Sequence, residues 1–251
     1  MNYESNGELI AKINGTKKKL HVSCDNCDDT THKELKLPLG QSFQLTVNPD
    51  KERQILYICG ASGSGKSFFA KQYCDEYTRH YKKNPIYLFS SLPADDSVDC
   101  IKNLKRVNIR DIEFISEDLD IDDFKDSLII FDDTDCISDK QIKNKIQSIA
   151  EMCLETGRHK SISIIFTSHT ACNGHQTKKI LNESHSITLF LRSLGGKALK
   201  YLLESYFGLD KKQIKKIKSM KGDGRALTIT KTFPVVAFSE KRAILLHDED
   251  D

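Results

Sequence analysis

The segment GASGSGKS, residues 60–67, limits what this chain can fold into more than any other stretch. It lies between the apolar run QILYIC at 54–59 and the helix-like segment that begins at Lys66. It matches the pattern G-x-x-x-x-G-K-[ST] in the required context, after a strand and at the start of a helix. The glycines let successive backbone N–H groups point inward at phosphate oxygens, and the helix N-terminus adds its positive dipole end. The segment therefore predicts a phosphate-binding loop, or P-loop.

The predicted cofactors of this loop are ATP and Mg²⁺. Lys66 is expected to reach the β- and γ-phosphates and Ser67 to bind the magnesium ion. The residues expected to contact the nucleotide are Gly60, Ala61, Ser62, Gly63, Ser64, Gly65, Lys66, Ser67 and Phe68.

The rest of the chain alternates predicted strands with predicted helices. Apolar runs without alternation at 54–59, 85–91, 127–133 and 161–168 favour buried parallel strands. A capping-box pattern at Ser138 and Gln141 starts a helix that Gly157 is expected to stop. Further helices are expected near 175–183, 197–207 and 211–220, and further strands at 186–191, 226–230 and 234–238. This order predicts an α/β fold with a mostly parallel sheet and helices on both faces.

Three regions are expected along the chain. Residues 1–50 are short alternating segments, broken by Gly40 and Pro49, and predict a β-rich N-terminal extension. Residues 51–247 form the predicted P-loop domain, and residues 248–251 an acidic tail.

Two carboxylates end the predicted strand LIIFDD. Asp132 is expected to hold the magnesium ion through water, and Asp133 to act as the base that polarises the attacking water. A helix or turn cap is the alternative role for Asp133. A third strand ends at Thr167, Ser168 and His169, and we expect Ser168, or alternatively Thr167, to sense the γ-phosphate.

Phosphoryl transfer gains from a cation supplied by a neighbouring subunit. Arg158, which follows Gly157, is the first candidate, and Arg192 is the second. A surface or helix-end position is the alternative for both.

Charge and cysteine content limit the partners and the compartment. The formal net charge is +2, but residues 172–231 carry 13 Lys and Arg against 4 Asp and Glu, so a nucleic-acid partner is open. Eight dispersed cysteines without a preceding signal segment favour reduced thiols and an intracellular protein. Cys24 and Cys27 have zinc-like spacing, although a solvent-facing turn is the alternative. No apolar run approaches the roughly 18 residues of a membrane span, so no membrane partner is expected.

Several motifs together resemble one known group of proteins. GASGSGKS, LIIFDD, GRHKSISIIFTSH followed by ILNES, and the late ALTITKTFPVVAFSEKRAILL are similar to the genome-packaging ATPases of large DNA viruses and virophages. That group is the poxvirus-type branch of the FtsK/HerA superfamily. The resemblance spans roughly residues 50–247. FtsK and HerA relatives have a glutamine or asparagine sensor where Ser168 and His169 stand here, and commonly a glutamate at the position of Asp133.

The resemblance implies a RecA-like fold of the additional-strand type, with a C-terminal β-hairpin. It also implies a pentameric or hexameric ring around double-stranded DNA, read without sequence specificity, and ATP hydrolysis that drives DNA into a capsid. A capsid or portal component is then a further partner. An arginine finger is expected at a position like Arg158. The implied location is the host cytoplasm at a virus assembly site, or the virion.

Other functions remain open from the residues. A small-molecule or nucleoside kinase also uses this loop, but it needs an arginine-rich lid, and residues 85–126 hold only Arg106 and Arg110. A two-domain helicase needs a second RecA-like domain. A GTPase is disfavoured because this sequence has no N-K-x-D segment for guanine. An ABC ATPase is disfavoured because no signature loop precedes the predicted strand LIIFDD. A weakly hydrolysing structural subunit stays open because Asp133 replaces the usual glutamate.

Overall fold

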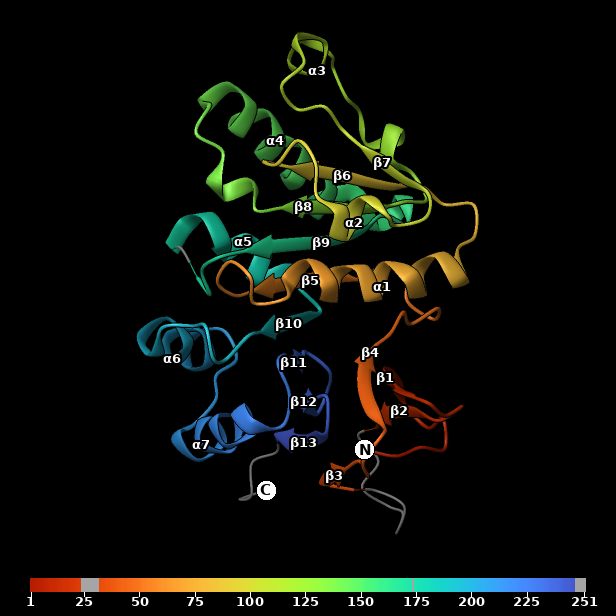
Figure 1. Ribbon diagram of the computed structural model, residues 1–251, viewed down its shortest axis with the longest axis vertical. Helices are drawn as coiled ribbons and strands as arrows, with labels where there is room; N and C mark the ends of the chain where they lie inside the picture. Colours follow the sequence, from red (N-terminus) through yellow and green to blue (C-terminus); the bar gives the residue numbers. More distant parts are fainter. Residues whose placement is uncertain (24–31, 173, 247–251) are drawn as a thin grey trace.

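A ten-stranded sheet forms the centre of the computed structural model, which describes residues 1–23, 32–172 and 174–246 (Figure 1). In spatial order its strands are β3 (Glu34–Lys36), β13 (Arg242–Leu246), β12 (Val235–Ser239), β11 (Leu227–Thr230), β10 (Ser186–Leu189), β5 (Ile55–Cys59), β9 (Ser163–Ser168), β8 (Leu128–Asp132), β6 (Ile86–Ser90) and β7 (Leu104–Arg106). A separate small sheet has the order β2-β1-β4 and consists of β1 (Glu8–Asn14), β2 (Lys19–Val22) and β4 (Ser42–Leu45).

The strand order identifies the fold. Strands β10, β5, β9, β8, β6 and β7 pair in parallel, and β9 lies between the P-loop strand β5 and the strand β8 that ends in the two aspartates. Strands β11, β12, β13 and β3 extend the sheet by antiparallel pairs, and β12 and β13 form a hairpin. The protein therefore has the predicted RecA-like P-loop NTPase fold with an additional strand.

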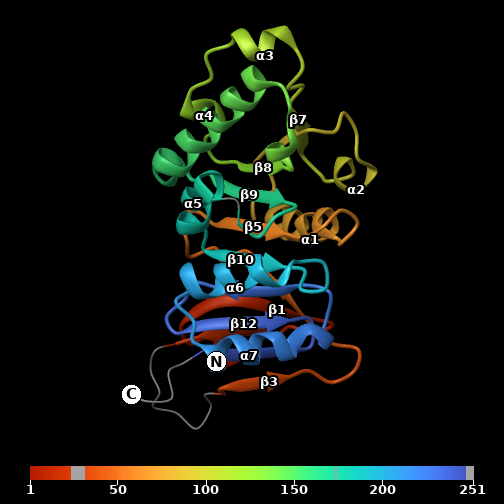
Figure 2. The same ribbon diagram turned by 90° about the vertical axis from the view of Figure 1, so that its left-hand side faces the viewer.

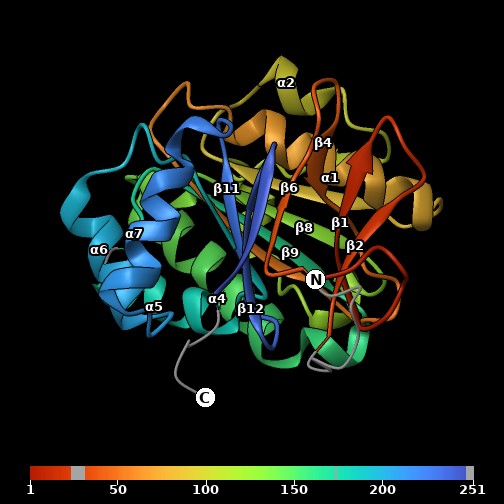
Figure 3. The ribbon, with the colours of Figure 1, turned by 90° about the horizontal axis from the view of Figure 1, so that it is seen from below.

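Helices cover both faces of the sheet. They are α1 (Lys66–His80), α2 (Asp96–Asp99), α3 (Ile112–Ser116), α4 (Lys140–Thr156), α5 (Gly174–Glu183), α6 (Gly196–Ser205) and α7 (Lys211–Ser219). Helices α4 to α7 lie on one face, and α1 lies beside the small β2-β1-β4 sheet on the other (Figures 2 and 3). Helix α1, which follows the P-loop glycines, thus lies next to the N-terminal extension.

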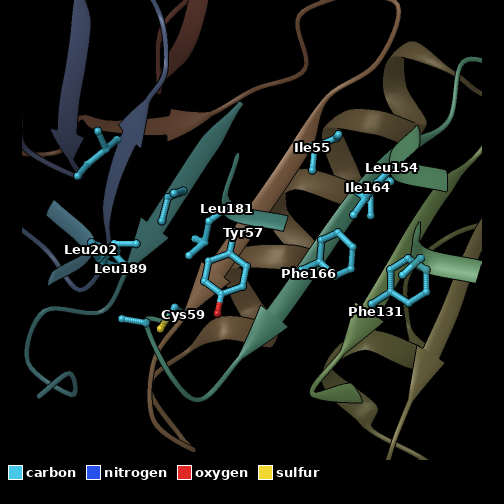
Figure 4. Packing of buried hydrophobic residues seen from close by; sticks show 14 of the residues in the cluster. Ile55, Tyr57, Cys59, Phe131, Leu154, Ile164, Phe166, Leu181, Leu189 and Leu202 are labelled. Carbon is cyan, nitrogen blue, oxygen red and sulfur yellow. The ribbon is translucent and has the colours of Figure 1, made fainter. Parts of the chain in front are cut away.

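The core between the sheet and helices α4 to α6 is built from side chains on adjacent strands. Phe89, Phe131 and Phe166 occupy matching register positions on β6, β8 and β9, with ring centroids 5.3 and 5.0 Å apart in stacked pairs. Tyr57 and Leu181 belong to the same cluster (Figure 4). Complete burial of one such aromatic side chain contributes about 1.5–3 kcal/mol. This packing fixes the relative positions of the strands that end at the site.

The start of α4 differs from the prediction. The predicted capping box at Ser138 and Gln141 is wrong, because Asp139 is the N-cap. Its carboxylate accepts hydrogen bonds from the backbone N–H groups of Gln141 and Ile142 at 2.8 and 3.0 Å. A charged acceptor at a helix N-terminus satisfies two free donors and interacts favourably with the helix dipole, so it is preferred over the serine.

The end of α4 confirms the prediction that Gly157 stops the helix, because the last helical residue is Thr156 and Gly157 is the C-cap. Gly157 has φ −62°, and the chain continues through a 3₁₀ turn, Gly157–Lys160, before Ser161 takes the left-handed conformation. A Cβ atom at position 157 would lie 3.2 Å from Nη1 of Arg53. Arg53 donates hydrogen bonds to the carbonyls of Cys153 and Leu154, two of the last carbonyls of α4. The glycine therefore leaves room for the arginine that caps the helix.

Helices α2 and α3 and strand β7 had no counterpart in the sequence interpretation. Each has only three to five residues, and both helices begin at aspartate N-caps, Asp95 and Asp111. Segments this short carry too few apolar positions to show a period.

Two predicted features fall outside the described residues. Cys24 and Cys27 belong to residues 24–31, and the acidic tail at 248–251 follows the last described residue. Within the described ranges, none of the helices has the length and apolar character needed to cross a membrane.

Candidate nucleotide site

The P-loop connects β5 to α1 and has the backbone conformation that its glycines allow. Gly63 and Gly65 have φ values of 71° and 110°, in the left-handed region that favours glycine. A Cβ atom at Gly60 would lie 2.9 Å from Phe190, so a side chain there would collide with the neighbouring strand end. The hydroxyl of Ser64 is buried and has no hydrogen-bond partner among the described residues. A bound phosphate oxygen would satisfy this hydroxyl.

Lys66 lies at the centre of the site, with only 6% of its surface exposed. Its Nζ donates a hydrogen bond to the carbonyl oxygen of Gly60 at 3.1 Å and lies 3.6 Å from Oδ2 of Asp133. The P-loop lysine and the second aspartate of β8 are thus brought together as an ion pair.

Asp132 is held by hydroxyl groups from both neighbouring strands. Ser90 on β6 donates to its Oδ2 at 3.0 Å, and Thr167 on β9 donates to its Oδ1 at 2.8 Å. The three residues are register partners at the carboxyl ends of parallel strands. Asp132 is buried, and these two hydrogen bonds orient its carboxylate.

Asp133 follows β8 in the left-handed conformation, with φ 46°. This conformation is uncommon for a non-glycine residue, although aspartate tolerates it better than most. Its Oδ2 lies 3.0 Å from Nε2 of His169, and its backbone N–H donates to the hydroxyl of Thr167 at 3.0 Å. Burial raises the pKa of the Asp133 carboxyl, and the negative charge of Asp132 adds to the rise, although Lys66 opposes it.

The two hydroxyl candidates on β9 point in different directions. Thr167 contacts both Asp132 and Asp133, on the face of the sheet that α1 covers. Ser168 donates to Oδ2 of Asp135 at 2.9 Å and accepts from the backbone N–H of Thr170. The structure therefore brings Thr167, but not Ser168, into contact with the two strand-end aspartates.

Arg158 lies at the opposite edge of the sheet from the P-loop. It precedes β9, whereas the site lies at the carboxyl end of that strand. Six residues of β9 separate the two edges by roughly 16 Å. Arg158 is exposed and forms an ion pair with Glu52. It does not reach the P-loop of its own chain.

Arg192 is exposed and follows β10 near the P-loop. The next residue, Ser193, accepts a hydrogen bond from the backbone N–H of Ala61 at 3.1 Å. Among the residues that the structure describes, Arg192 has no hydrogen-bond or ion-pair partner. The second candidate cation is therefore at the P-loop edge, unlike the first.

The residues present fit a nucleotide and a magnesium ion. The P-loop supplies the buried Lys66 ammonium and the unsatisfied Ser64 hydroxyl for phosphate. The Ser67 hydroxyl and the Asp132 carboxylate are oxygen ligands, which Mg²⁺ prefers, and this ion commonly keeps several waters and substrate phosphates in its shell. A cluster of three or more His, Cys, Asp or Glu side chains suited to a metal does not occur in the described ranges.

Two residues of the site were not among the catalytic candidates from the sequence. Ser90 ends β6, so the rule that polar residues at the carboxyl ends of parallel strands meet at one edge could have identified it. His169 was considered only as part of a sensor region. It contacts both members of the Lys66–Asp133 ion pair, with its Nδ1 3.4 Å from Nζ of Lys66 and its Nε2 3.0 Å from Oδ2 of Asp133.

Helix α7 presents a basic face. Ile214 and Ile217 are buried, while the lysines on the other side of the helix are exposed. These lysines are Lys211, Lys212, Lys215, Lys216 and Lys218. Separation of apolar and basic residues on the two sides of one helix provides a positively charged surface.

Several known proteins resemble this chain. A family model described as RNA helicase matches residues 56–128, fewer than a third of the chain, and ends before Asp132. The uncharacterized protein V3 of the Sputnik virophage is 38% identical over 252 residues, and the match covers 97% of each protein.

Two solved structures are also similar. The genome packaging NTPase B204 from Sulfolobus turreted icosahedral virus 2, in complex with sulfate, has 14% identity and a TM-score of 0.48, and the match covers 78% of this chain and 100% of that chain. The pCW3 conjugation coupling protein TcpA, in its monomer form with ATPgS, has 11% identity and a TM-score of 0.44, and the match covers 96% of this chain and 78% of that chain.

Proposed function

This chain belongs to the same protein family as the uncharacterized protein V3 of the Sputnik virophage, and we propose that it is an ATP-hydrolysing motor that moves double-stranded DNA into a viral capsid. The observation that carries the proposal is the convergence of Lys66, Asp133 and Asp132 at one edge of a sheet whose strand β9 lies between the P-loop strand and the aspartate strand. The motifs shared with FtsK/HerA-type packaging ATPases, and the virophage relative, support this choice among P-loop enzymes.

Lys66 and the P-loop backbone would bind the phosphates of ATP. Ser67, and Asp132 through water, would hold Mg²⁺, which when bound supplies charge that neutralises the β- and γ-oxygens. Asp133 would accept the proton of the attacking water, and its raised pKa makes it a stronger base than an ordinary aspartate. In this assignment Lys66 moves from Asp133 to the phosphates when ATP binds, which frees the carboxylate for the water.

Thr167 would position both aspartates relative to the γ-phosphate. Its hydroxyl is within hydrogen-bond distance of both carboxylates, so a change at one carboxylate is transmitted to the other. Ser168, which contacts Asp135, would act only through that residue and the segment that follows β9. We therefore favour Thr167 over Ser168 as the sensor.

Double-stranded DNA is the proposed polymer substrate, and the basic face of α7 is its proposed contact. Lysines spaced along one side of a helix bind phosphates without reading base sequence, as a motor that moves along any genome must. A homo-oligomeric ring of five or six subunits, with Arg158 of one subunit at the nucleotide of the next, completes the proposal. Its exposed position at the far edge of the sheet suits a role in a neighbouring subunit better than one in its own site.

ATP turnover measured with and without long duplex DNA tests this function. We expect duplex DNA to stimulate turnover several-fold, and we expect Lys66→Ala to abolish both the basal and the stimulated rates. Replacement of Lys211, Lys212 and Lys215 by glutamine should remove the stimulation and leave the basal rate intact. Replacement of the exposed lysines Lys17, Lys18 and Lys36 in the N-terminal extension is the matched control, because it removes the same charge elsewhere.

Three outcomes would contradict the proposal. A rate indifferent to DNA, combined with phosphate transfer to a nucleoside, would identify a kinase. Stimulation by RNA duplexes with strand separation would identify a helicase. ATP binding without measurable turnover, alone or with DNA, would identify a nucleotide-dependent structural subunit.

A further inference from the structure

A cavity lies on the side of the P-loop away from Asp132 and Asp133. Its volume is about 220 Å³, far more than the roughly 15 Å³ that a single water needs. Gly65 of the P-loop and Phe190, the residue after β10, both form part of its wall. The cavity is therefore continuous with the loop that would bind phosphates.

Segments far apart in the sequence enclose this cavity. Strand β4 of the N-terminal extension contributes Ser42 and Gln44, the first turns of α1 contribute Phe68 and Gln72, and the β12–β13 turn contributes Glu240. Hydrogen bonds join these parts directly. The side-chain amide of Gln44 donates to the carbonyl of Gln72 at 3.4 Å, and the backbone N–H of Phe43 donates to the carbonyl of Glu240 at 2.8 Å.

The chemistry of the lining suits an aromatic, hydrogen-bonding, uncharged group. Phe68 is 62% exposed at this cavity, although most large apolar side chains of the described chain are buried. Aromatic faces stack on nucleobases whatever their sequence. Asn14, Gln44 and Gln72 supply both donors and acceptors. The charges of Glu240 and Arg225 offset each other at this site, so the cavity does not attract a phosphate as the P-loop does.

We propose that this cavity binds the base and ribose of the nucleoside triphosphate, and that the N-terminal extension forms one wall of this nucleoside site. The proposal rests on the proposed function, since it assumes that ATP binds with its phosphates on the P-loop. The positions of the two sites fix the orientation: the anionic end of ATP lies at the backbone donors and Lys66, and the nucleoside end extends past Gly65 toward β4. Residues 1–50 then take part in nucleotide binding.

A comparison of ATP with inorganic tripolyphosphate tests the inference. Both ligands can occupy the P-loop, but only ATP has a group for the cavity. Calorimetric titration in the presence of Mg²⁺ should give the wild-type protein at least tenfold higher affinity for ATP than for tripolyphosphate. Ser42→Phe, which fills the cavity from β4, should remove this difference and leave the tripolyphosphate affinity unchanged. Leu39→Ser is the matched control, because Leu39 belongs to the same extension but is 98% exposed and does not line the cavity.

Photolabelling of the wild-type full-length chain provides a test that depends on no variant. Irradiation with 8-azido-ATP followed by peptide mapping should place label within residues 42–45 or 68–72. Label confined to other segments would overturn the inference, as would equal affinities for ATP and tripolyphosphate or a full tenfold preference retained by Ser42→Phe. In each of these three cases, tripolyphosphate that binds the wild-type protein and fails to bind Lys66→Ala would support the P-loop as the phosphate site even though the nucleoside site is wrong. Failure of the wild-type protein to bind either ligand would overturn both the nucleoside site and the proposed function.

Discussion

The hydroxyl of Thr167 donates a hydrogen bond to Oδ1 of Asp132 at 2.8 Å and accepts one from the backbone N–H of Asp133 at 3.0 Å. One side chain on β9 therefore sets the positions of two adjacent carboxylates on β8. The proposed magnesium ligand and the proposed base are held in one hydrogen-bonded unit, so that loss of this hydroxyl should affect both.

Thr167→Val keeps the shape of the side chain and removes the hydroxyl. A hydrogen bond to a charged group contributes about 1.5–3 kcal/mol, so we expect kcat/KM for ATP to fall roughly 10–100-fold. The magnesium concentration that gives half-maximal turnover should rise as well. Thr167→Ser, which keeps the hydroxyl, should retain most of the activity. Ser168→Ala is the comparison that separates the two sensor candidates, and a larger loss in Ser168→Ala than in Thr167→Val would reverse our assignment.

Asp133→Asn tests the proposed base. Asparagine tolerates the left-handed conformation at this position, so the backbone should be preserved. We expect kcat to fall 100-fold or more while ATP binding is retained, because the variant loses the proton acceptor and keeps Lys66. Turnover within a few-fold of wild type would show instead that Asp133 serves as a turn residue.

The pH profile of turnover gives a second test of Asp133. A base must be deprotonated, and burial raises the pKa of this carboxyl above the ordinary value of 3.8. As pH falls, kcat/KM should therefore be lost at a pH above 3.8, because its pH dependence reports the pKa of Asp133 in the nucleotide-free protein. The protein should remain folded over that range by circular dichroism. An acid midpoint at or below 3.8 would contradict the raised pKa.

The local chemistry of the site was predictable from the sequence, whereas its side-chain contacts were not. The P-loop and the LIIFDD strand can be identified from the sequence alone, because each motif consists of consecutive residues. The choice between Thr167 and Ser168 depends on which face of β9 each side chain occupies, and β9 is buried on both faces, so its sequence shows no alternation. The contacts of His169 with Lys66 and Asp133 also depend on the tertiary structure. The nucleoside cavity could not be predicted because its walls, which include β4, α1 and the β12–β13 turn, come from segments far apart in the chain.

Arg158 lies too far from its own P-loop to act there, so its proposed role requires a second subunit. Arg158→Ala should lower kcat by about 10³-fold or more and leave nucleotide affinity unchanged. Glu52→Gln is the matched control, because it breaks the same ion pair and keeps the cation. A mixture of Arg158→Ala and Asp133→Asn subunits should recover part of the lost activity, since some interfaces combine an intact Asp133 with an intact Arg158. No recovery on mixing, under conditions where subunits exchange, would contradict a role in trans.

His185 makes the stability of the fold dependent on pH. Its Nδ1 accepts a hydrogen bond from the backbone N–H of Ile55 at 3.0 Å, and burial lowers the pKa of His185 from 6.5 to about 4, with nearby Lys51 and Arg53 adding to the effect. The folded chain therefore holds this histidine neutral, while the unfolded chain takes up a proton near pH 6.5. The resulting stability is fully present above pH 6.5, is lost as pH falls toward about 4, and amounts to at most about 3 kcal/mol.

His185→Asn keeps an acceptor for Ile55 and cannot titrate. In urea denaturation between pH 7.5 and 4, the unfolding free energy of wild type should fall more steeply than that of His185→Asn, whereas His80→Asn, at an exposed site, should parallel wild type. If the unfolding free energies of wild type and His185→Asn differ by the same amount at every pH, His185 has the same pKa in the folded and unfolded chains, which would contradict the prediction.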